Sequence, residues 1–130
     1  MAYNNRFEKS VLAKLSQQFP DLAPAFEAIC GAMADLMLPF QKRWVYCDAM
    51  HGSFSIKAVL PALCDNDPEL DYHRLPLVHN GAEAMSAFST LHLVDDTAEV
   101  QRIRQALLSY CHLDTLAMAK ILEKLYTFVD

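Results

Sequence analysis

Hydrophobic residues recur along most of this chain at the three- and four-residue spacing of amphipathic helices. The first such repeat predicts a helix over residues 6–19. Asn4 or Asn5 can cap its first turn, and Pro20 ends it, because proline cannot continue a helix. The apolar stripe of this helix consists of Phe7, Val11, Leu12, Leu15 and Phe19.

Two further helices are predicted before the middle of the chain. Pro24 suits the first turn of the second helix. Residues 47–54 indicate a loop in which Gly52 is free to adopt a positive φ. Ser53 or Ser55 can cap the third helix. Its apolar positions are Ile56, Val59, Leu60 and Leu63.

The second half of the chain carries two capping patterns. Asn80, followed three residues later by Glu83, predicts a helix that runs to about Leu93. Asp96 and Glu99 repeat this arrangement ahead of the last apolar segment. Both patterns pair a good N-cap residue with a carboxylate in the first turn, so two separate helices are expected.

The sequence favours a mostly α fold with a few short strands, organised as a single domain over residues 1–130. Residues 35–37 and 44–46 are the predicted strands, since both are short apolar runs next to turn-forming residues. No Gly/Ser linker, internal repeat or low-complexity segment divides the chain.

Composition excludes several classes of protein. Hydrophobic residues make up 53% of the 130 positions and charged residues 21%, which excludes a disordered chain. No uncharged apolar run reaches the ~20 residues that span a bilayer, so no membrane association is expected. A net charge of −5 does not fit a protein that coats nucleic acid through bulk charge.

The cysteine pattern predicts reduced, mostly buried thiols in a cytoplasmic protein. Cys47 and His51 have the four-residue spacing of two metal ligands, but no second ligand pair accompanies them. The chain contains no CxxC pair, which argues against a zinc ribbon or a disulfide framework. The four cysteines are Cys30, Cys47, Cys64 and Cys111.

Asp114 interrupts the apolar stripe of residues 107–129, one helical turn after Tyr110. A carboxylate on such a stripe costs free energy unless it is paired, caps a helix or binds metal. Two interpretations follow. Either Asp114 is a functional carboxylate, or the helix breaks at residues 112–113 and Asp114 caps its continuation; the spacing alone favours the cap.

Glu8 is the second candidate carboxylate. It lies next to Phe7, on the side of the first helix that carries the apolar stripe. A glutamate in a first turn also interacts favourably with the helix dipole, and this structural role needs no function.

Two segments together resemble DEDD-type 3′–5′ exonucleases, which have a ribonuclease H-like fold. The sequence YNNRFE at residues 3–8 resembles the second motif of these enzymes, and YCHLD at residues 110–114 resembles the third, Tyr-x-x-x-Asp. Between them, DLM at residues 35–37 and GSFSIKAVLP at residues 52–61 are similar to one bacterial branch, a family of unknown function. The resemblance extends over residues 3–125.

The resemblance implies a partial ribonuclease H-like α/β domain that hydrolyses a phosphodiester of nucleic acid with two metal ions. Such enzymes hold Mg²⁺ or Mn²⁺ with four carboxylates. Glu8 and Asp114 would be metal ligands, and Tyr110 would orient the attacking water. Asn4 and Lys57 would contact single-stranded nucleic acid; alternatively, Lys57 is a solvated lysine on a helix surface.

One part of the exonuclease pattern is absent. The family's first motif, Asp-x-Glu on a strand, should precede Tyr3, where only Met1 and Ala2 stand. Residues 67–69 read Asp-Pro-Glu, but a central proline belongs to a turn. We therefore expect a C-terminal portion that lacks its first strands and is inactive alone, with a homodimer or an upstream domain covering its apolar surface. The alternative is a non-catalytic interaction or structural domain.

Three aromatic residues around the loop after residue 43 admit two interpretations. Trp44, Tyr46 and Phe54 have side chains that can stack on nucleic-acid bases. Aromatic side chains in a chain of this size more often close a small core, and the sequence favours that interpretation.

Overall fold

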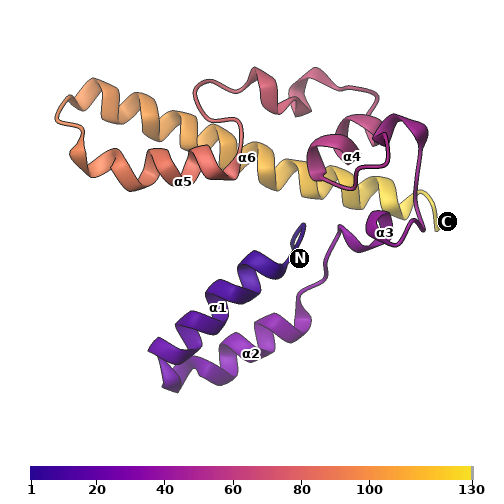
Figure 1. Ribbon diagram of the computed structural model, residues 1–130, viewed down its shortest axis with the longest axis horizontal. Coiled ribbons are helices and arrows are strands. Elements are labelled where there is room, and N and C mark those ends of the chain that lie inside the picture. The colour runs from indigo at the N-terminus through magenta and orange to yellow at the C-terminus, as the bar shows by residue number, and fades with distance from the viewer. Residues whose placement is uncertain (130) are drawn as a thin grey trace. The chain divides into compact units, whose positions relative to one another are not determined.

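The computed structural model describes residues 1–129 and is mostly helical, as predicted (Figure 1). The internal contacts divide the chain into two compact units, Met1–Ile56 and Lys57–Asp130. A single domain over residues 1–130 stays a prediction.

The first unit begins with a pair of helices. α1 (Arg6–Gln18) and α2 (Ala23–Ala32) lie side by side, joined by the short 3₁₀ helix η1 (Pro20–Leu22) (Figure 1). Pro20 lies two residues beyond α1, and Pro24 lies in the first turn of α2. The bounds of both helices confirm the predictions made from these two prolines and from the apolar repeat.

The apolar face of this helix pair is open. Within residues 6–32, all of which the structure describes, no residue of α1 or α2 is buried. Phe7 is 59% exposed and Ile29 is 50% exposed. The amphipathic helix is therefore present, but its stripe does not form a core.

The two predicted strands of the first unit are wrong. Residues 1–129 contain no sheet, and a single parallel bridge between Ala2 and Asp35 is the only strand-like pairing among them. Residues 44 and 45 form bends instead, and residue 46 has no regular secondary structure. A lone bridge does not make a strand, because extended backbone needs continuous partners for its hydrogen bonds.

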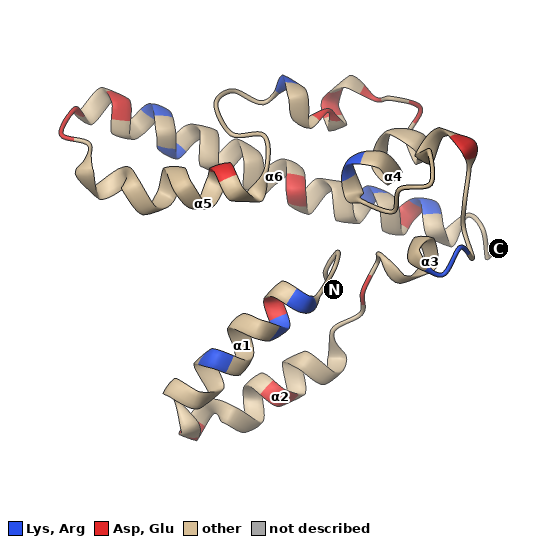
Figure 2. Ribbon diagram, viewed as in Figure 1, with Lys and Arg blue, Asp and Glu red and all other residues tan. Residues whose placement is uncertain are grey.

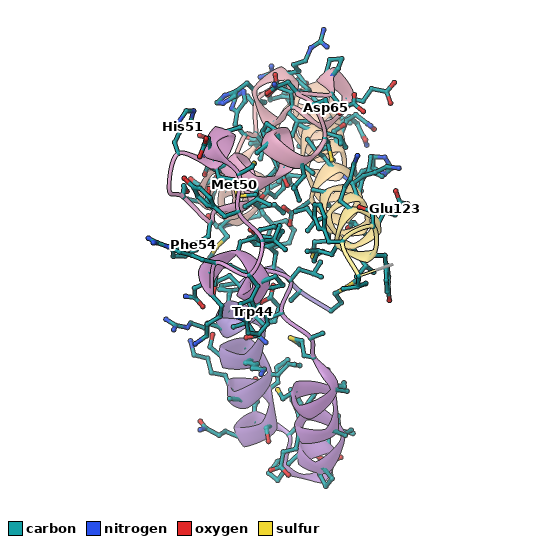
Figure 3. The ribbon with its side chains drawn as sticks, turned by 90° about the vertical axis from the view of Figure 1, so that its right-hand side faces the viewer. Trp44, Met50, His51, Phe54, Asp65 and Glu123 are labelled. Carbon is teal, nitrogen blue, oxygen red and sulfur yellow. The ribbon has the colours of Figure 1, made fainter. Side chains whose placement is uncertain are left out.

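The remainder of the first unit consists of α3 (Leu38–Gln41), the 3₁₀ helix η2 (Asp48–Met50) and the connecting loops. After η2 the chain turns through His51 and Gly52, which both have positive φ (48° and 75°), as predicted for Gly52. Met50 is 1% exposed, whereas His51 is exposed (Figure 3). The buried side chains of this unit are Ala2, Leu36, Met37, Phe40 and Met50.

The second unit is built around one long helix. Helix α5 (Gly81–Thr90) packs along helix α6 (Thr97–Tyr126), and the 3₁₀ helix η3 (Pro68–Leu70) also contacts α6. The predicted third helix and the predicted helix from residue 80 are both present. The elements are α4 (Ile56–Leu63), η3 (Pro68–Leu70), η4 (Tyr72–Arg74), α5 (Gly81–Thr90), η5 (Leu91–Leu93) and α6 (Thr97–Tyr126).

Both capping predictions in this unit are confirmed. The Asn80 side chain accepts a hydrogen bond from the Glu83 backbone N–H at 2.9 Å, and the Glu83 carboxylate accepts one from the His79 backbone N–H at 2.8 Å. The Asp96 side chain caps α6 by accepting from the Ala98 backbone N–H at 2.9 Å. Each helix therefore begins directly after a residue whose side chain accepts a hydrogen bond from a backbone N–H of the first turn.

α6 runs unbroken over 30 residues. The interpretation of Asp114 as an N-cap is therefore wrong, because the helix does not end at residues 112–113. The local preference of aspartate for caps is overridden by the apolar stripe, which continues on both sides of it. The buried residues of α6 are Ala106, Leu113, Ala117 and Ile121.

Charged residues of both signs alternate along α6 (Figure 2). Two of its pairs are ion pairs on the helix surface: Glu99 with Arg102 at 2.7 Å and Lys120 with Glu123 at 2.9 Å. Among residues 1–129, no helix combines the length and the apolar character that crossing a bilayer requires.

Candidate functional site

Asp114 lies half-buried in the middle of α6. Its Oδ1 accepts a hydrogen bond of 3.0 Å from the Tyr72 hydroxyl, which comes from a segment 42 residues earlier in the chain. Within the described part of the chain, Asp114 forms no ion pair. Among the described residues, Oδ1 of Asp114 therefore has one donor and Oδ2 has none.

Tyr72 is the centre of a cluster in the second unit. It is 5% exposed, and its ring centroid lies 6.1 Å from that of Tyr110 at a tilt of 57°. The Lys57 Nζ lies 5.8 Å from the centroid of the Tyr72 ring, a cation–π distance. The structure thus brings together three predicted site residues, Lys57, Tyr110 and Asp114, around a residue that was not predicted.

Both tyrosines of the cluster stay protonated at neutral pH. Burial raises the pKa of Tyr72 far above its usual value, and the charge of Asp114 and the hydrogen bond to it raise this pKa further. Burial and then the charge of Asp114 raise the pKa of Tyr110. The Tyr72 hydroxyl is therefore a permanent donor to Asp114.

The Tyr110 hydroxyl lies at the start of α5. It is 3.6 Å from the position that a Cβ on Gly81 would take, which is ordinary van der Waals contact. In the described part of the chain the Tyr110 hydroxyl has no hydrogen-bond partner. It is therefore available to a water or a ligand.

A cavity of about 260 Å³ lies beside the cluster, between α4 and the η3–η4 segment. Lys57 and Tyr72 both contribute to its wall, together with Asp71 and His73. Lys57 is exposed, so its ammonium is accessible from solvent. Lys57 therefore lies at the wall of a cavity, which distinguishes it from a lysine on an open helix surface.

Asp35 organises the other predicted motif, in the first unit. Its Oδ1 accepts hydrogen bonds from the backbone N–H groups of Asn4 (2.9 Å) and Met37 (3.0 Å), and its Oδ2 accepts from that of Asn5 (3.1 Å). Asn4 reaches this geometry with a φ of 62°, which asparagine tolerates better than most residues. One carboxylate thereby fixes the turn that leads into α1.

Tyr3 adds a second connection to the same turn. Its hydroxyl donates a hydrogen bond of 2.7 Å to the Phe54 carbonyl. Burial raises the pKa of Tyr3 well above its usual value, and the charge of Asp35 adds to this. The Tyr3 hydroxyl therefore remains a donor at neutral pH.

Glu8 lies in the first turn of α1 and is half-buried. Its Oε2 is shielded from solvent and has no hydrogen-bond partner among the described residues. An unpaired, buried carboxylate oxygen is costly, so Glu8 differs from a glutamate that only interacts with the helix dipole.

These observations test whether the residues fit a divalent metal. Glu8 and Asp114 each offer a carboxylate oxygen without a protein partner, and such oxygens are the ligands that Mg²⁺ and Mn²⁺ prefer. The type of donor therefore fits. Within residues 1–129, however, no group of three or more His, Cys, Asp or Glu side chains surrounds a common point. Cys47 and His51 belong to no such group either.

The Asp-Pro-Glu segment is not a strand motif. Asp67 caps η3 by accepting a hydrogen bond of 2.9 Å from the Glu69 backbone N–H, which confirms the predicted turn. The Asp67 carboxylate is therefore engaged in capping η3.

Two predictions about side-chain burial are wrong. Trp44 and Phe54, labelled in Figure 3, and Tyr46 are all exposed, with Trp44 at 75%, so they do not close a core. The four cysteines carry reduced thiols, as predicted, but none is buried and Cys111 is exposed. The three aromatic residues lie in bends and loops and not on the apolar stripe of a helix, which explains their exposure.

Sequence reasoning missed Tyr72 and the role of Asp35. Neither belongs to a helical stripe, and each acts on a partner 30 or more residues away. For Tyr72 the available signal was the pair of aspartates that cap consecutive 3₁₀ turns, Asp67 and Asp71, since Tyr72 is the buried first residue of the second turn.

Comparison with known proteins gives one match. Residues 1–55 are similar to a family described as "Domain of unknown function (DUF2779)", and this range coincides closely with the first unit, Met1–Ile56. No curated protein and no solved structure matches the chain. A family of unknown function was expected, and the match supports that part of the resemblance.

Proposed function

We propose that this chain is part of a metal-dependent 3′–5′ exonuclease-like domain of the ribonuclease H-like kind, acting on nucleic acid. Asp114 carries the proposal: a half-buried carboxylate in an unbroken helix, held on one oxygen by a neutral donor and free on the other. The shielded, unpaired Oε2 of Glu8 supports it as well. Both features suit a metal ligand and disfavour a merely structural role.

In this proposal each residue has a distinct task. Glu8 and Asp114 would each be a ligand of Mg²⁺ or Mn²⁺, which would supply charge stabilisation and a nucleophilic water. Tyr110 would orient that water, and Asn4 and Lys57 would contact the nucleic acid. Lys57 faces the cavity beside Tyr72, which gives it a place to meet a phosphate.

The proposal extends to the partners and the cell compartment. The exposed side chains of Trp44, Tyr46 and Phe54 offer stacking surfaces for single-stranded nucleic acid. The reduced state of the four cysteines suits the reducing cytoplasm. A second copy or an upstream domain would cover the open face of the α1–α2 pair.

Metal binding tests this function directly. We expect Mn²⁺, added to the ¹⁵N-labelled chain, to broaden the amide resonances near Glu8 and near Asp114. Glu8→Gln and Asp114→Asn remove one charge each without changing shape, so each should weaken Mn²⁺ binding at least about 10-fold, as measured by calorimetric titration.

Two exposed acids provide matched controls. Glu27 lies in α2, and Asp95 lies just before α6. The substitutions Glu27→Gln and Asp95→Asn should both leave the Mn²⁺ affinity unchanged. Broadening that avoids both Glu8 and Asp114, or an affinity that Asp114→Asn does not alter, would contradict the proposal.

Activity gives a second test. We expect the chain alone to leave 3′-labelled single-stranded DNA and RNA intact in the presence of Mg²⁺ or Mn²⁺. The physical reason is that two of the four carboxylates are missing: the sequence has no Asp-x-Glu on a strand, and residues 67–69 form a capped turn. Metal-dependent degradation well above background would show that this view of the site is wrong.

A non-catalytic interaction domain is the second candidate. It is favoured by the lack of a three-ligand group within residues 1–129 and by the open apolar face of α1 and α2. The Mn²⁺ titration separates the two candidates, because an interaction domain has no reason to bind the ion at Asp114.

A further inference from the structure

We propose that a second copy of this chain covers the open face of the α1–α2 pair, with α1 of each copy lying against α2 of the other. This proposal depends on neither a metal ion nor exonuclease activity, and it selects a second copy over an upstream domain as the cover. The open face consists of the exposed large apolar side chains between the start of α1 and the end of α2: Phe7, Val11, Phe19, Leu22 and Ile29.

The open face continues the apolar stripes of the two helices. On α1, Val11 lies one turn after Phe7, and the half-buried Leu15 lies one turn after Val11. On α2, the exposed Ile29 lies one turn after the half-buried Phe26. The contact between the two helices therefore covers only part of each stripe.

The exposed area is what a stable dimer needs. The five side chains are 39–59% exposed, which amounts to about 450 Å² if a fully exposed side chain of this size offers about 190 Å². A stable interface buries about 800 Å² on each partner, and somewhat more than half of this area is apolar. The open face therefore supplies the apolar part of one such interface.

The charges of the first unit's helices are divided by sign between α1 and the segment that follows it (Figure 2). α1 has three cations and one carboxylate, which gives it a net charge of +2. η1 and α2 have two carboxylates and no cation, a net charge of −2. None of these side chains forms an ion pair within residues 1–129. The cations of α1 are Arg6, Lys9 and Lys14, and the carboxylates are Glu8 on α1, Asp21 on η1 and Glu27 on α2.

This division of charge makes the helix pair complementary to itself. Two identical chains related by a two-fold axis contact each other through the same surface, so each contact occurs twice. Placing α1 of one copy against α2 of the other brings opposite net charges together both times. Placing α1 against α1 and α2 against α2 would bring like charges together, which disfavours that arrangement.

Sedimentation velocity of the full chain, from micromolar to submillimolar concentration, tests the proposal. We expect a monomer–dimer equilibrium in the wild type. Phe7→Glu and Ile29→Lys should each raise the dissociation constant of the dimer at least about 100-fold, because each copy brings one unpaired charge into the apolar interface. Both side chains are about half exposed in one copy, so neither substitution disturbs a core.

Matched controls make the same chemical changes outside the open face. Phe88 on α5 is 71% exposed and Leu93 on η5 is 69% exposed. Phe88→Glu and Leu93→Lys should leave the dissociation constant unchanged. A dimer that the controls weaken as much as Phe7→Glu and Ile29→Lys do would overturn the proposal, because its interface would not be the open face.

Two measurements on the wild type need no variant. In a mixture of ¹³C-labelled and unlabelled chains, isotope-filtered NOEs should connect α1 of one copy with α2 of the other; NOEs from α1 to α1 would overturn the proposed pairing. The amide protons of α1 and α2 should also exchange more slowly as the protein concentration rises, since dimerisation covers them.

A chain that stays monomeric at every concentration overturns the proposal and leaves an upstream domain as the cover of the open face. That result does not affect the exonuclease proposal, which the Mn²⁺ titration tests independently.

Discussion

Asp35→Ala is expected to lower the free energy of unfolding of the first unit by about 3 kcal/mol. The substitution removes the acceptor of three backbone N–H groups, those of Asn4, Asn5 and Met37, and hydrogen bonds to a charged group contribute about 1.5–3 kcal/mol each when well shielded. Because one of these hydrogen bonds is exposed and the other two are only part-buried, each contributes about 1 kcal/mol, which gives a sum of about 3 kcal/mol. Urea unfolding, followed through the amide resonances of residues 1–56, measures the loss.

Two further variants give this prediction its controls. Asp48→Ala removes an exposed carboxylate from the same unit and should change the unfolding free energy by no more than about 0.5 kcal/mol. Asp35→Asn keeps one acceptor oxygen and should show an intermediate loss. Equal effects of Asp35→Ala and Asp48→Ala would mean that the turn into α1 is held by something else.

Leu60→Ala is expected to destabilise the second unit by about 3 kcal/mol, within the 2–5 kcal/mol that buried leucines show on truncation. Leu60 in α4 is 0% exposed, so the lost methyl groups leave a cavity in addition to the lost transfer free energy. Denaturant unfolding monitored by the amide resonances of α4 and α6 is the appropriate measurement.

Leu108→Ala is the matched control for this truncation. Leu108 lies on α6 but is 61% exposed, and the same chemical change there should alter stability by no more than about 0.5 kcal/mol. A loss at Leu108 comparable to that at Leu60 would contradict the assignment of the core to the buried side of α4.

The helices of this protein follow from local chemistry, which explains why the sequence predicts them. Pro20 and Pro24 set the limits of α1 and α2, and Asn80 and Asp96 begin α5 and α6 by accepting hydrogen bonds from nearby backbone N–H groups. Each of these interactions spans a few residues, so a pattern in the sequence is enough to locate it.

The errors concern interactions between distant segments. Residues 35–37 have the composition of a strand, but extended backbone needs a partner along its length, and Ala2 supplies one bridge only. Aspartate favours helix N-caps, but Asp114 lies inside α6, where its carboxylate accepts a hydrogen bond from Tyr72, 42 residues earlier in the chain. No periodicity in the sequence reports such partners.

Only part of the candidate site could be predicted from the sequence. Tyr110 and Asp114 share one helix, so their proximity follows from helical spacing alone. The involvement of Tyr72 and Lys57 depends on how α4 and the η3–η4 turns pack, which spacing cannot supply.

The open face of the α1–α2 pair has a consequence for the protein's dynamics. Segments with few buried apolar contacts open at a lower free energy than the core does. The amide protons of α1 and α2 should therefore exchange with solvent sooner than those of α4 and α6, where Val59, Leu60, Ala117 and Ile121 are inaccessible. A protease that requires an unfolded substrate would accordingly cut first within residues 6–32.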